Sequence, residues 1–267
     1  MVPVSPRCLS PKPSVGYLSA YGNSLKSFIL VAADQSTGSS TDVANITQYT
    51  PRTGEVLQLQ QYLPAGEEGN GVPSPDDSEF VAEVGPPGPQ LNLWVSDFRT
   101  MQFRQLTTGT SQDFNAVWRP DGQQIVFTRL LPPFPSITSQ LMTVSSQGGM
   151  PATILGTGDH VVEAAYSSDG NRLVFNSING LETIDLGSMQ RKVLLTLDQL
   201  NGNPRERSLV GRGLAWATTQ DTIILIMHDL SANRDQLWTV SSDGSNFKSI
   251  YTADSGVSIQ SVDFVEN

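Results

Sequence analysis

The chain has 267 residues, of which 38% are hydrophobic and 16% are charged, a composition typical of a folded globular protein. Its 26 acidic residues outnumber the 16 basic ones and give a net charge of −10, which disfavours binding to nucleic acid or to an anionic membrane surface. No stretch contains the roughly 20 apolar residues that a membrane-spanning helix needs, so we expect no membrane span.

Residues 1–14 are rich in proline and serine and are expected to form a lead-in to a single domain over residues 15–267. This lead-in lacks the apolar core of a signal peptide. Cys8 is the single cysteine, so no intramolecular disulfide can form. The acidic composition, poor in cysteine and rich in serine, threonine, glutamine and asparagine, favours a periplasmic or secreted protein, with the cytoplasm as the alternative.

A short motif recurs along the chain: an apolar stretch ends in an aromatic residue, turns through an Asp-Gly segment, and enters a strand rich in β-branched residues. The clearest copies are residues 117–127 and 165–175. The motif defines five modules, each with a first predicted strand, a turn and a second strand. These lie at residues 16–21, 22–24 and 28–31 in the first module, at 117–118, 119–122 and 124–127 in the third, at 165–166, 167–170 and 172–175 in the fourth, and at 214–216, 218–221 and 223–226 in the fifth. The second module is degenerate in its first strand and keeps the turn at 75–77 and the second strand at 80–82.

Further strands are predicted after these, the third of a module at residues 91–95, 141–144 and 237–240, and the fourth at 103–106 and 247–250. No window keeps a helical apolar period for long, so the sequence predicts an all-β fold. Repeats of about 40–50 residues are typical of four-stranded propeller blades.

The motif has a physical cause. An Asp-Gly pair supplies the positive φ that a two-residue hairpin needs, and a preceding proline presets the entry to the turn. The aromatic residue before the turn and the strand after it are expected to be buried between neighbouring sheets, so the modules must stack around an axis to cover both of their faces.

The motif resembles the repeat of TolB-type, WD-related β-propellers, which pair a Ser-Pro-Asp-Gly turn with an aliphatic strand. Residues 117–127, 164–175 and 237–244 carry the resemblance, whereas the turn at 218–221 lacks the Asp-Gly pair. The resemblance extends over residues 15–264 and implies an all-β propeller of four-stranded blades. It does not imply one function, because propellers serve unrelated roles.

The sequence is compatible with two blade counts. Residues 257–264 look like the inner strand of a further module, after which the chain stops. The ring therefore has either five blades and one extra C-terminal strand, or it is an incomplete six-bladed ring.

Propeller topology sorts the loops into two faces. The turns that join first and second strands lie on one face, here called the turn face. The longer connections lie on the other, the loop-rich face, where we expect binding. This face is expected to gather acidic residues, among them Glu67, Glu68 and Asp113. The partner-binding candidates on it are Leu131 and Phe134, from an apolar proline-rich loop, and two histidine–aspartate neighbours, Asp159 with His160 and His228 with Asp229.

The sequence contains no nucleophile elbow, no histidine cluster with metal-ligand spacing and no glycine-rich phosphate loop, so we predict no catalytic residue, metal or cofactor. It favours a non-catalytic scaffold of the bacterial cell envelope that binds a protein or peptide partner through the loop-rich face. One alternative, implied by the resemblance, is a propeller-type lyase or hydrolase acting through His160 and His228, or an accessory domain of a larger enzyme. Another is a sensor that binds a small glycan or peptide in the central channel.

Overall fold

The computed structural model describes residues 15–24, 27–34, 44–50, 53–58, 67–86, 90–98, 100, 102–133, 138–200, 213–217, 221–229, 232–255 and 259. Within these ranges the chain forms five four-stranded sheets, and each sheet follows the order of the sequence. The strands of a sheet are antiparallel to their neighbours, so each sheet is a simple meander.

The first sheet contains β1 (Val15–Ser24), β2 (Ser27–Asp34), β3 (Ala44–Thr50) and β4 (Glu55–Gln58). The second contains β5 (Glu67–Pro73), β6 (Glu79–Gly85), β7 (Asn92–Asp97) and β8 (Phe103–Gln105). The third contains β9 (Gln112–Trp118), β10 (Gln124–Leu130), β11 (Ser139–Ser145) and β12 (Ala152–Leu155). The fourth contains β13 (Ala164–Tyr166), β14 (Arg172–Ser177), β15 (Gly180–Asp185) and β16 (Arg191–Thr196). The fifth contains β17 (Leu214–Trp216), β18 (Thr222–Asp229), β19 (Arg234–Ser241) and β20 (Lys248–Thr252).

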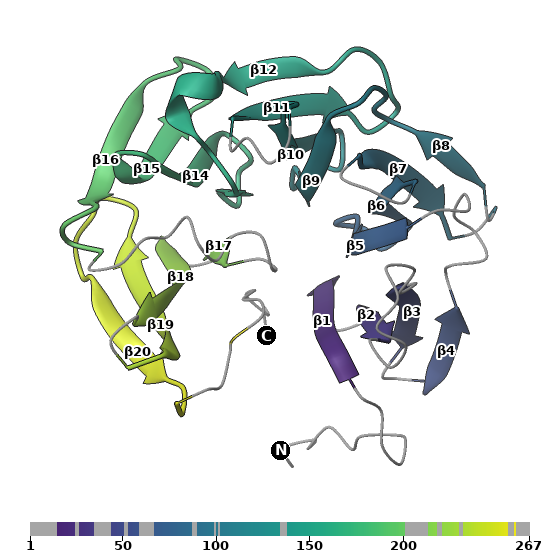
Figure 1. Cartoon of the computed structure of the whole chain (residues 1–267), viewed down its shortest axis with the longest axis horizontal. Coiled ribbons are helices and arrows are strands. Elements are labelled where there is room, and N and C mark those ends of the chain that lie inside the picture. Colours follow the sequence, from purple (N-terminus) through teal and green to yellow (C-terminus); the bar gives the residue numbers. More distant parts are fainter. Residues whose placement is uncertain are drawn as a thin grey trace.

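The sheets are arranged around a common centre, with β1, β5, β9 and β17 on the inside and β4, β8, β12 and β20 on the outside (Figure 1). Successive first strands contact one another, β1 with β5, β5 with β9, β9 with β13 and β13 with β17. This is the geometry of a β-propeller, and it confirms the predicted all-β propeller of four-stranded sheets. The blade count of the ring stays a prediction, because residues 257–264 lie outside the described residues except for Ile259.

The core lies between neighbouring sheets, as the motif predicts. One cluster of buried residues joins Val81 and Val95 of the second sheet to Trp118 and Phe127 of the third. The aromatic residues that end the inner strands are buried, namely Trp118, Tyr166 and Trp216. Each large side chain therefore stabilises two sheets at once.

The turns between first and second strands differ from the predicted two-residue hairpin. The Arg119 amide donates to the Gln124 carbonyl at 2.8 Å and closes a loop of four residues, 120–123. The same loop closes in the fourth sheet, where the Ser167 amide donates to the Arg172 carbonyl at 2.9 Å and Ser168 stands in the place of Pro120, so the longer turn does not depend on the proline. Of the Asp-Gly pairs, the glycines have the predicted positive φ, Gly122 (+71°) and Gly170 (+68°), but the aspartates before them do not, so the two-residue hairpin does not form.

Glu67 and Glu68, which were expected in a connection of the loop-rich face, lie instead at the start of β5 and pair with β6. They belong to a blade and not to a loop. Among the described residues no helix has the length and apolarity to cross a bilayer.

Candidate functional site

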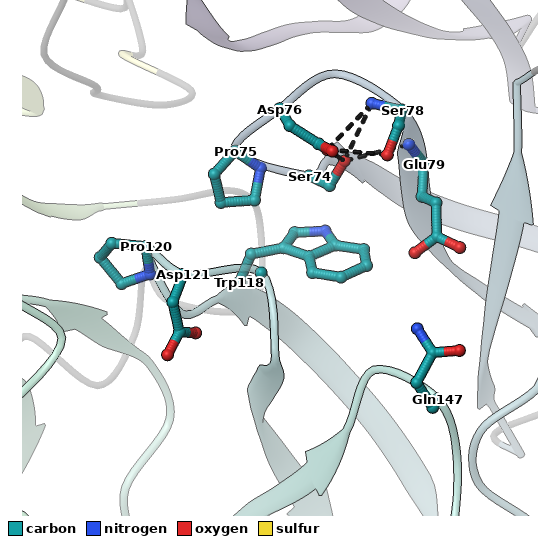
Figure 2. Close-up of a pocket in the computed structure, with 10 residues that line it drawn as sticks. Ser74, Pro75, Asp76, Ser78, Glu79, Trp118, Pro120, Asp121 and Gln147 are labelled. Carbon is teal, nitrogen blue, oxygen red and sulfur yellow. Dashed lines mark hydrogen bonds between the residues drawn. The ribbon is translucent and has the colours of Figure 1, made fainter.

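A cavity of about 460 Å³ opens on the turn face between the second and third sheets. It lies where the β5–β6 turn, the β9–β10 turn and the β11–β12 turn meet, and its size is in the range of small-ligand sites. The lining residues, most of them labelled in Figure 2, are Ser74, Pro75, Asp76, Ser78, Glu79, Trp118, Pro120, Asp121, Gly122 and Gln147.

The indole of Trp118 lies in the middle of this set (Figure 2). Its Nε1–H donates to the Val72 carbonyl at 2.9 Å, which fixes the orientation of the ring across the two sheets. Pro75 and Pro120 stiffen the turns on the two sides. The cavity therefore has a rigid aromatic centre that needs little reordering when a ligand enters.

One wall of the cavity is a carboxylate held by hydroxyl groups. Asp76 Oδ1 accepts hydrogen bonds from Ser74 Oγ at 2.7 Å, from Ser78 Oγ at 2.8 Å and from the Ser78 amide at 3.1 Å. The hydrogen bond from Ser74, followed by that from Ser78, lowers the pKa of Asp76 below its ordinary value. This side chain therefore keeps its negative charge under mildly acidic conditions.

The second carboxylate is neutralised within the chain. Glu79 forms a bidentate ion pair with Arg104, at 2.8 Å from Oε1 to Nη1 and 3.0 Å from Oε2 to Nη2. The same guanidinium donates to the Ser146 carbonyl in the β11–β12 turn. Arg104 thus connects the second sheet to the third beside the cavity.

The third carboxylate is Asp121, which is more exposed than Glu79. It accepts the Gln123 amide at 2.9 Å and lies 3.4 Å from Arg119, whose Nε donates to the Gly170 carbonyl of the next sheet. Because Glu79 and Asp121 are each paired with an arginine, the excess negative charge of the cavity comes from Asp76.

The candidates predicted on the loop-rich face are spread over three sheets. Leu131 follows β10 of the third sheet, and its amide donates to the Thr138 carbonyl at 2.9 Å, while Phe134 lies outside the described residues. Asp159 ends the short helix η2 (Thr157–Asp159) and pairs with Arg191 at 2.6 Å, with His160 following it.

The other predicted pair belongs to the fifth sheet. His228 lies near the end of β18, and not in a loop as predicted, because the β-ladder continues to the pair Asp229–Arg234. Its Nδ1 is 2.9 Å from Oδ1 of Asp235, a fully buried carboxylate that also accepts the Ile259 amide at 2.7 Å. Asp229 lies 3.9 Å from Arg234. The structure therefore does not gather those of the predicted residues that it describes into one site.

The acidic rim predicted for the loop-rich face is also reduced. Asp113 is 1% exposed and forms a bidentate pair with Arg129, so it is part of the interior and not of a solvated surface. Within the described part of the chain, no group of three or more histidine, cysteine, aspartate or glutamate side chains could hold a metal ion.

Sequence reasoning missed Asp76, Trp118 and Asp121 as a site. Their segments were identified as the repeat motif and interpreted only as scaffold. A signal was present, since Pro75-Asp76 and Pro120-Asp121 place two carboxylates in equivalent turns of neighbouring modules. Only the distance between the blades shows that the two turns share a cavity.

Comparison with known proteins identifies the fold. No family model matches the chain, and no curated protein matches it. Among solved structures it is similar to TolB from Acinetobacter baumannii, with a TM-score of 0.67 and 17% identity over 90% of this chain and 55% of that one. The fold is that of a TolB-like β-propeller. The chain thus spans about half the length of that TolB.

Two further structures are similar. A putative TolB from Agrobacterium tumefaciens gives a TM-score of 0.63 with 11% identity, over 88% of this chain and 80% of that one. An oligogalacturonate lyase in complex with manganese gives 0.58 with 12% identity, over 89% and 65%. At these identities the likeness concerns the fold, which hosts unrelated activities.

Proposed function

We propose that this TolB-like chain is a non-catalytic propeller scaffold of the bacterial cell envelope that binds a protein or peptide partner. The observation that carries the proposal is the turn-face cavity, a rigid concave site with an aromatic centre and a charged rim. Proteins commonly recognise partners through a few anchor side chains that enter such pockets. The predicted residues of the loop-rich face stay candidates for a second contact area.

The lining of the cavity favours binding over chemistry. The ten lining residues, all of them described, include no histidine, cysteine or lysine. The hydroxyl groups of Ser74 and Ser78 donate to Asp76, and neither has an imidazole beside it that would activate it as a nucleophile. The composition of the chain and its TolB-like fold support a location in the periplasm or outside the cell.

A peptide selection tests this proposal. Short random peptides displayed on phage are selected against the purified full chain, and binders are measured again with the variant Gln147→Trp. Gln147 is exposed at the edge of the cavity, so an indole there fills the cavity without touching the core. We expect enriched peptides that the variant no longer binds. Failure to enrich any peptide, or binders that the variant retains, would contradict a partner site at the cavity.

One observation favours the enzymatic alternative. A buried carboxylate orients the imidazole of His228, as a general base requires, and the lyase likeness supplies a reaction class to test. The His228–Asp235 pair belongs to the fifth sheet and the cavity to the second and third, so the two ideas can be tested separately. Cleavage of oligogalacturonate that is lost in His228→Gln would support the alternative, and absence of cleavage by the intact chain would reject it.

A further inference from the structure

The turn between the first and second strands is built in the same way in the second, third and fourth sheets. The amide of its first residue donates to the carbonyl five residues later, and the amide of its fourth residue, which has a positive φ, donates to the carbonyl of the first. The first residues are Ser74, Arg119 and Ser167, the third are Asp76, Asp121 and Asp169, and the fourth are Asp77, Gly122 and Gly170. The contacts at one junction between sheets can therefore be compared with those at the next.

An arginine fills the junction between the third and fourth sheets. Arg119 Nε donates to the Gly170 carbonyl at 3.1 Å, and its Nη1 lies 3.4 Å from Asp121 Oδ2. A Cβ added to Gly170 would lie 2.9 Å from this Nε, so the side chain rests directly on the turn of the fourth sheet. The guanidinium thus lies between the aspartate of its own turn and the glycine carbonyl of the next turn.

The cavity occupies the same place at the preceding junction, where the arginine is replaced by a serine. Ser74 is equivalent to Arg119, and its hydroxyl reaches only as far as Asp76 in its own turn, at 2.7 Å. The aspartate and the glycine of the two turns, Asp76 and Gly122, both line the cavity. The short side chain therefore leaves open the space that a guanidinium fills at the next junction.

The turns themselves approach each other in the same way at both junctions. Pro75 Cδ lies 4.0 Å from the Cβ that Gly122 would carry. At the next junction the distance from Pro120 Cδ to the corresponding position on Gly170 is 3.3 Å. The cavity thus keeps the framework of its filled counterpart and lacks the side chain.

The two groups that would hold a guanidinium lack such a partner in the cavity. Within the described part of the chain, no arginine or lysine pairs with Asp76, and no side chain donates to the Gly122 carbonyl. Arg104 is held by Glu79 and by the Ser146 carbonyl. Both open acceptors belong to the polar rim.

We propose that the cavity receives an arginine side chain of the partner, whose guanidinium lies between Asp76 and the Gly122 carbonyl. It repeats there the contacts that Arg119 makes at the next junction. This inference rests on the proposed function, because it names the group by which the partner is anchored. A guanidinium is a planar fork of five N–H donors and can serve a carboxylate and a carbonyl together, whereas the ammonium of lysine is a point charge.

Blocked tripeptides test the inference on the full chain. Gly-Arg-Gly, Gly-Lys-Gly and the uncharged Gly-citrulline-Gly are titrated separately, and two backbone amide signals are followed by NMR. The Ser78 amide donates to Asp76 at 3.1 Å, and the Gln123 amide shares a peptide unit with the Gly122 carbonyl, so these signals report on the two acceptors. We expect the arginine peptide to shift both signals, the lysine peptide to shift them less, and the citrulline peptide to leave them in place.

The amide of Asn171 is a control within the chain, because it shares a peptide unit with the Gly170 carbonyl, which Arg119 already occupies. We expect its signal to stay in place with all three peptides. Unmoved signals at the cavity would overturn the inference. An equal response to the lysine or citrulline peptide, or an equal shift of the Asn171 signal, would also overturn it, because the response would then not come from a guanidinium at this site.

A pair of variants at one position fills the cavity or leaves it open. Ser74→Arg supplies from the chain itself the side chain that the third sheet has at this position, and it should abolish the response to Gly-Arg-Gly. Ser74→Ala keeps the cavity open and should retain the response. A full response in Ser74→Arg, or a lost response in Ser74→Ala, would contradict the inference.

A second pair tests the carboxylate without filling the cavity. Asp76→Asn is expected to weaken arginine-peptide binding about two- to fivefold, as expected for loss of an exposed ion pair. Asp169→Asn, which changes an aspartate with the same serine contact in the fourth sheet, is expected to leave binding unchanged. Equal losses in both variants would speak against a site at Asp76.

The outcomes also distinguish this inference from the proposed function. Selected peptides that Gln147→Trp blocks but that contain no arginine would refute the arginine inference and leave the binding site in place. If no peptide is enriched and Gly-Arg-Gly causes no shift, both fail.

Discussion

The buried ion pair of Asp113 and Arg129 gives a prediction whose size follows from the structure. Asp113 is 1% and Arg129 16% exposed, and their two hydrogen bonds measure 2.7 and 2.8 Å. The hydrogen bond to Asp113 raises the pKa of Arg129, so the cation is permanent. Arg129→Met leaves the carboxylate buried without its partner, which typically costs about 3–5 kcal/mol. Because Arg129 is partly exposed and water can enter, we expect about 3 kcal/mol.

The reverse substitution should cost less. In Asp113→Leu the remaining guanidinium can turn toward water, so we expect a loss of about 1–2 kcal/mol, and the double variant with Arg129→Met should recover to within about 1 kcal/mol of the original chain. Arg234→Met is the control, because Arg234 and Asp229 are 3.9 Å apart and both partly exposed, and its expected loss is about 0–1 kcal/mol.

Urea unfolding at neutral pH measures these differences, provided that the slope of the free energy of unfolding against urea is the same for all variants. An Arg129→Met variant as stable as the control would refute the reasoning. A double variant less stable than Arg129→Met would also refute it, because the unpaired carboxylate would then not be the cause of the loss.

Three further predictions concern single side chains. Ser74→Ala removes the main hydrogen bond that lowers the pKa of Asp76, so an NMR titration should show that pKa rising toward its ordinary value. The stability that the ionised carboxylate contributes is present above about pH 4 and is lost as the pH falls through the folded pKa. On acidification the variant should therefore lose less free energy of unfolding than the original chain. Gly170→Ala should cost about 2 kcal/mol in thermal unfolding, since its φ is +68° and a Cβ would lie 2.9 Å from an arginine Nε; Gly122→Ala, at +71° with its nearest atom 4.0 Å away, should cost about 1 kcal/mol. Asp235→Ala leaves a partly buried imidazole and a backbone amide without their acceptor and should cost about 1–3 kcal/mol by urea unfolding.

The blades could be predicted from the sequence because their signals are local. An aromatic residue, a turn with a glycine at positive φ, and an alternating strand follow one another within about a dozen residues, and Trp118 and Gly122 are placed as their motif predicts. The predicted length of the turn was wrong because a two-residue hairpin needs positive φ at both residues of the Asp-Gly pair, and the aspartates Asp121 and Asp169 do not have it. Local sequence therefore predicted the strands of the blade but not the length of the turn between them.

The site could not be predicted in the same way, because it depends on contacts between blades. Whether Asp113 is solvated or buried depends on Arg129, which is 16 positions later in the chain, and whether Glu79 is free or paired depends on Arg104. The cavity itself exists only through the spacing of two sheets. The histidines were predicted as functional residues because of their residue type, but His228 is part of the β18–β19 ladder, where it is paired with Asp235.

The position of Arg104 has a consequence for the dynamics of the ring. Its guanidinium links the carboxylate of one blade to a carbonyl of the next, beside the cavity in which we propose the partner to bind. A ligand bound there contacts both blades and would link them a second time, beside the link that Arg104 makes. Amide hydrogen exchange in β6 and β11 should therefore slow together when the cavity is occupied, because transient separation of these blades would first require release of the ligand.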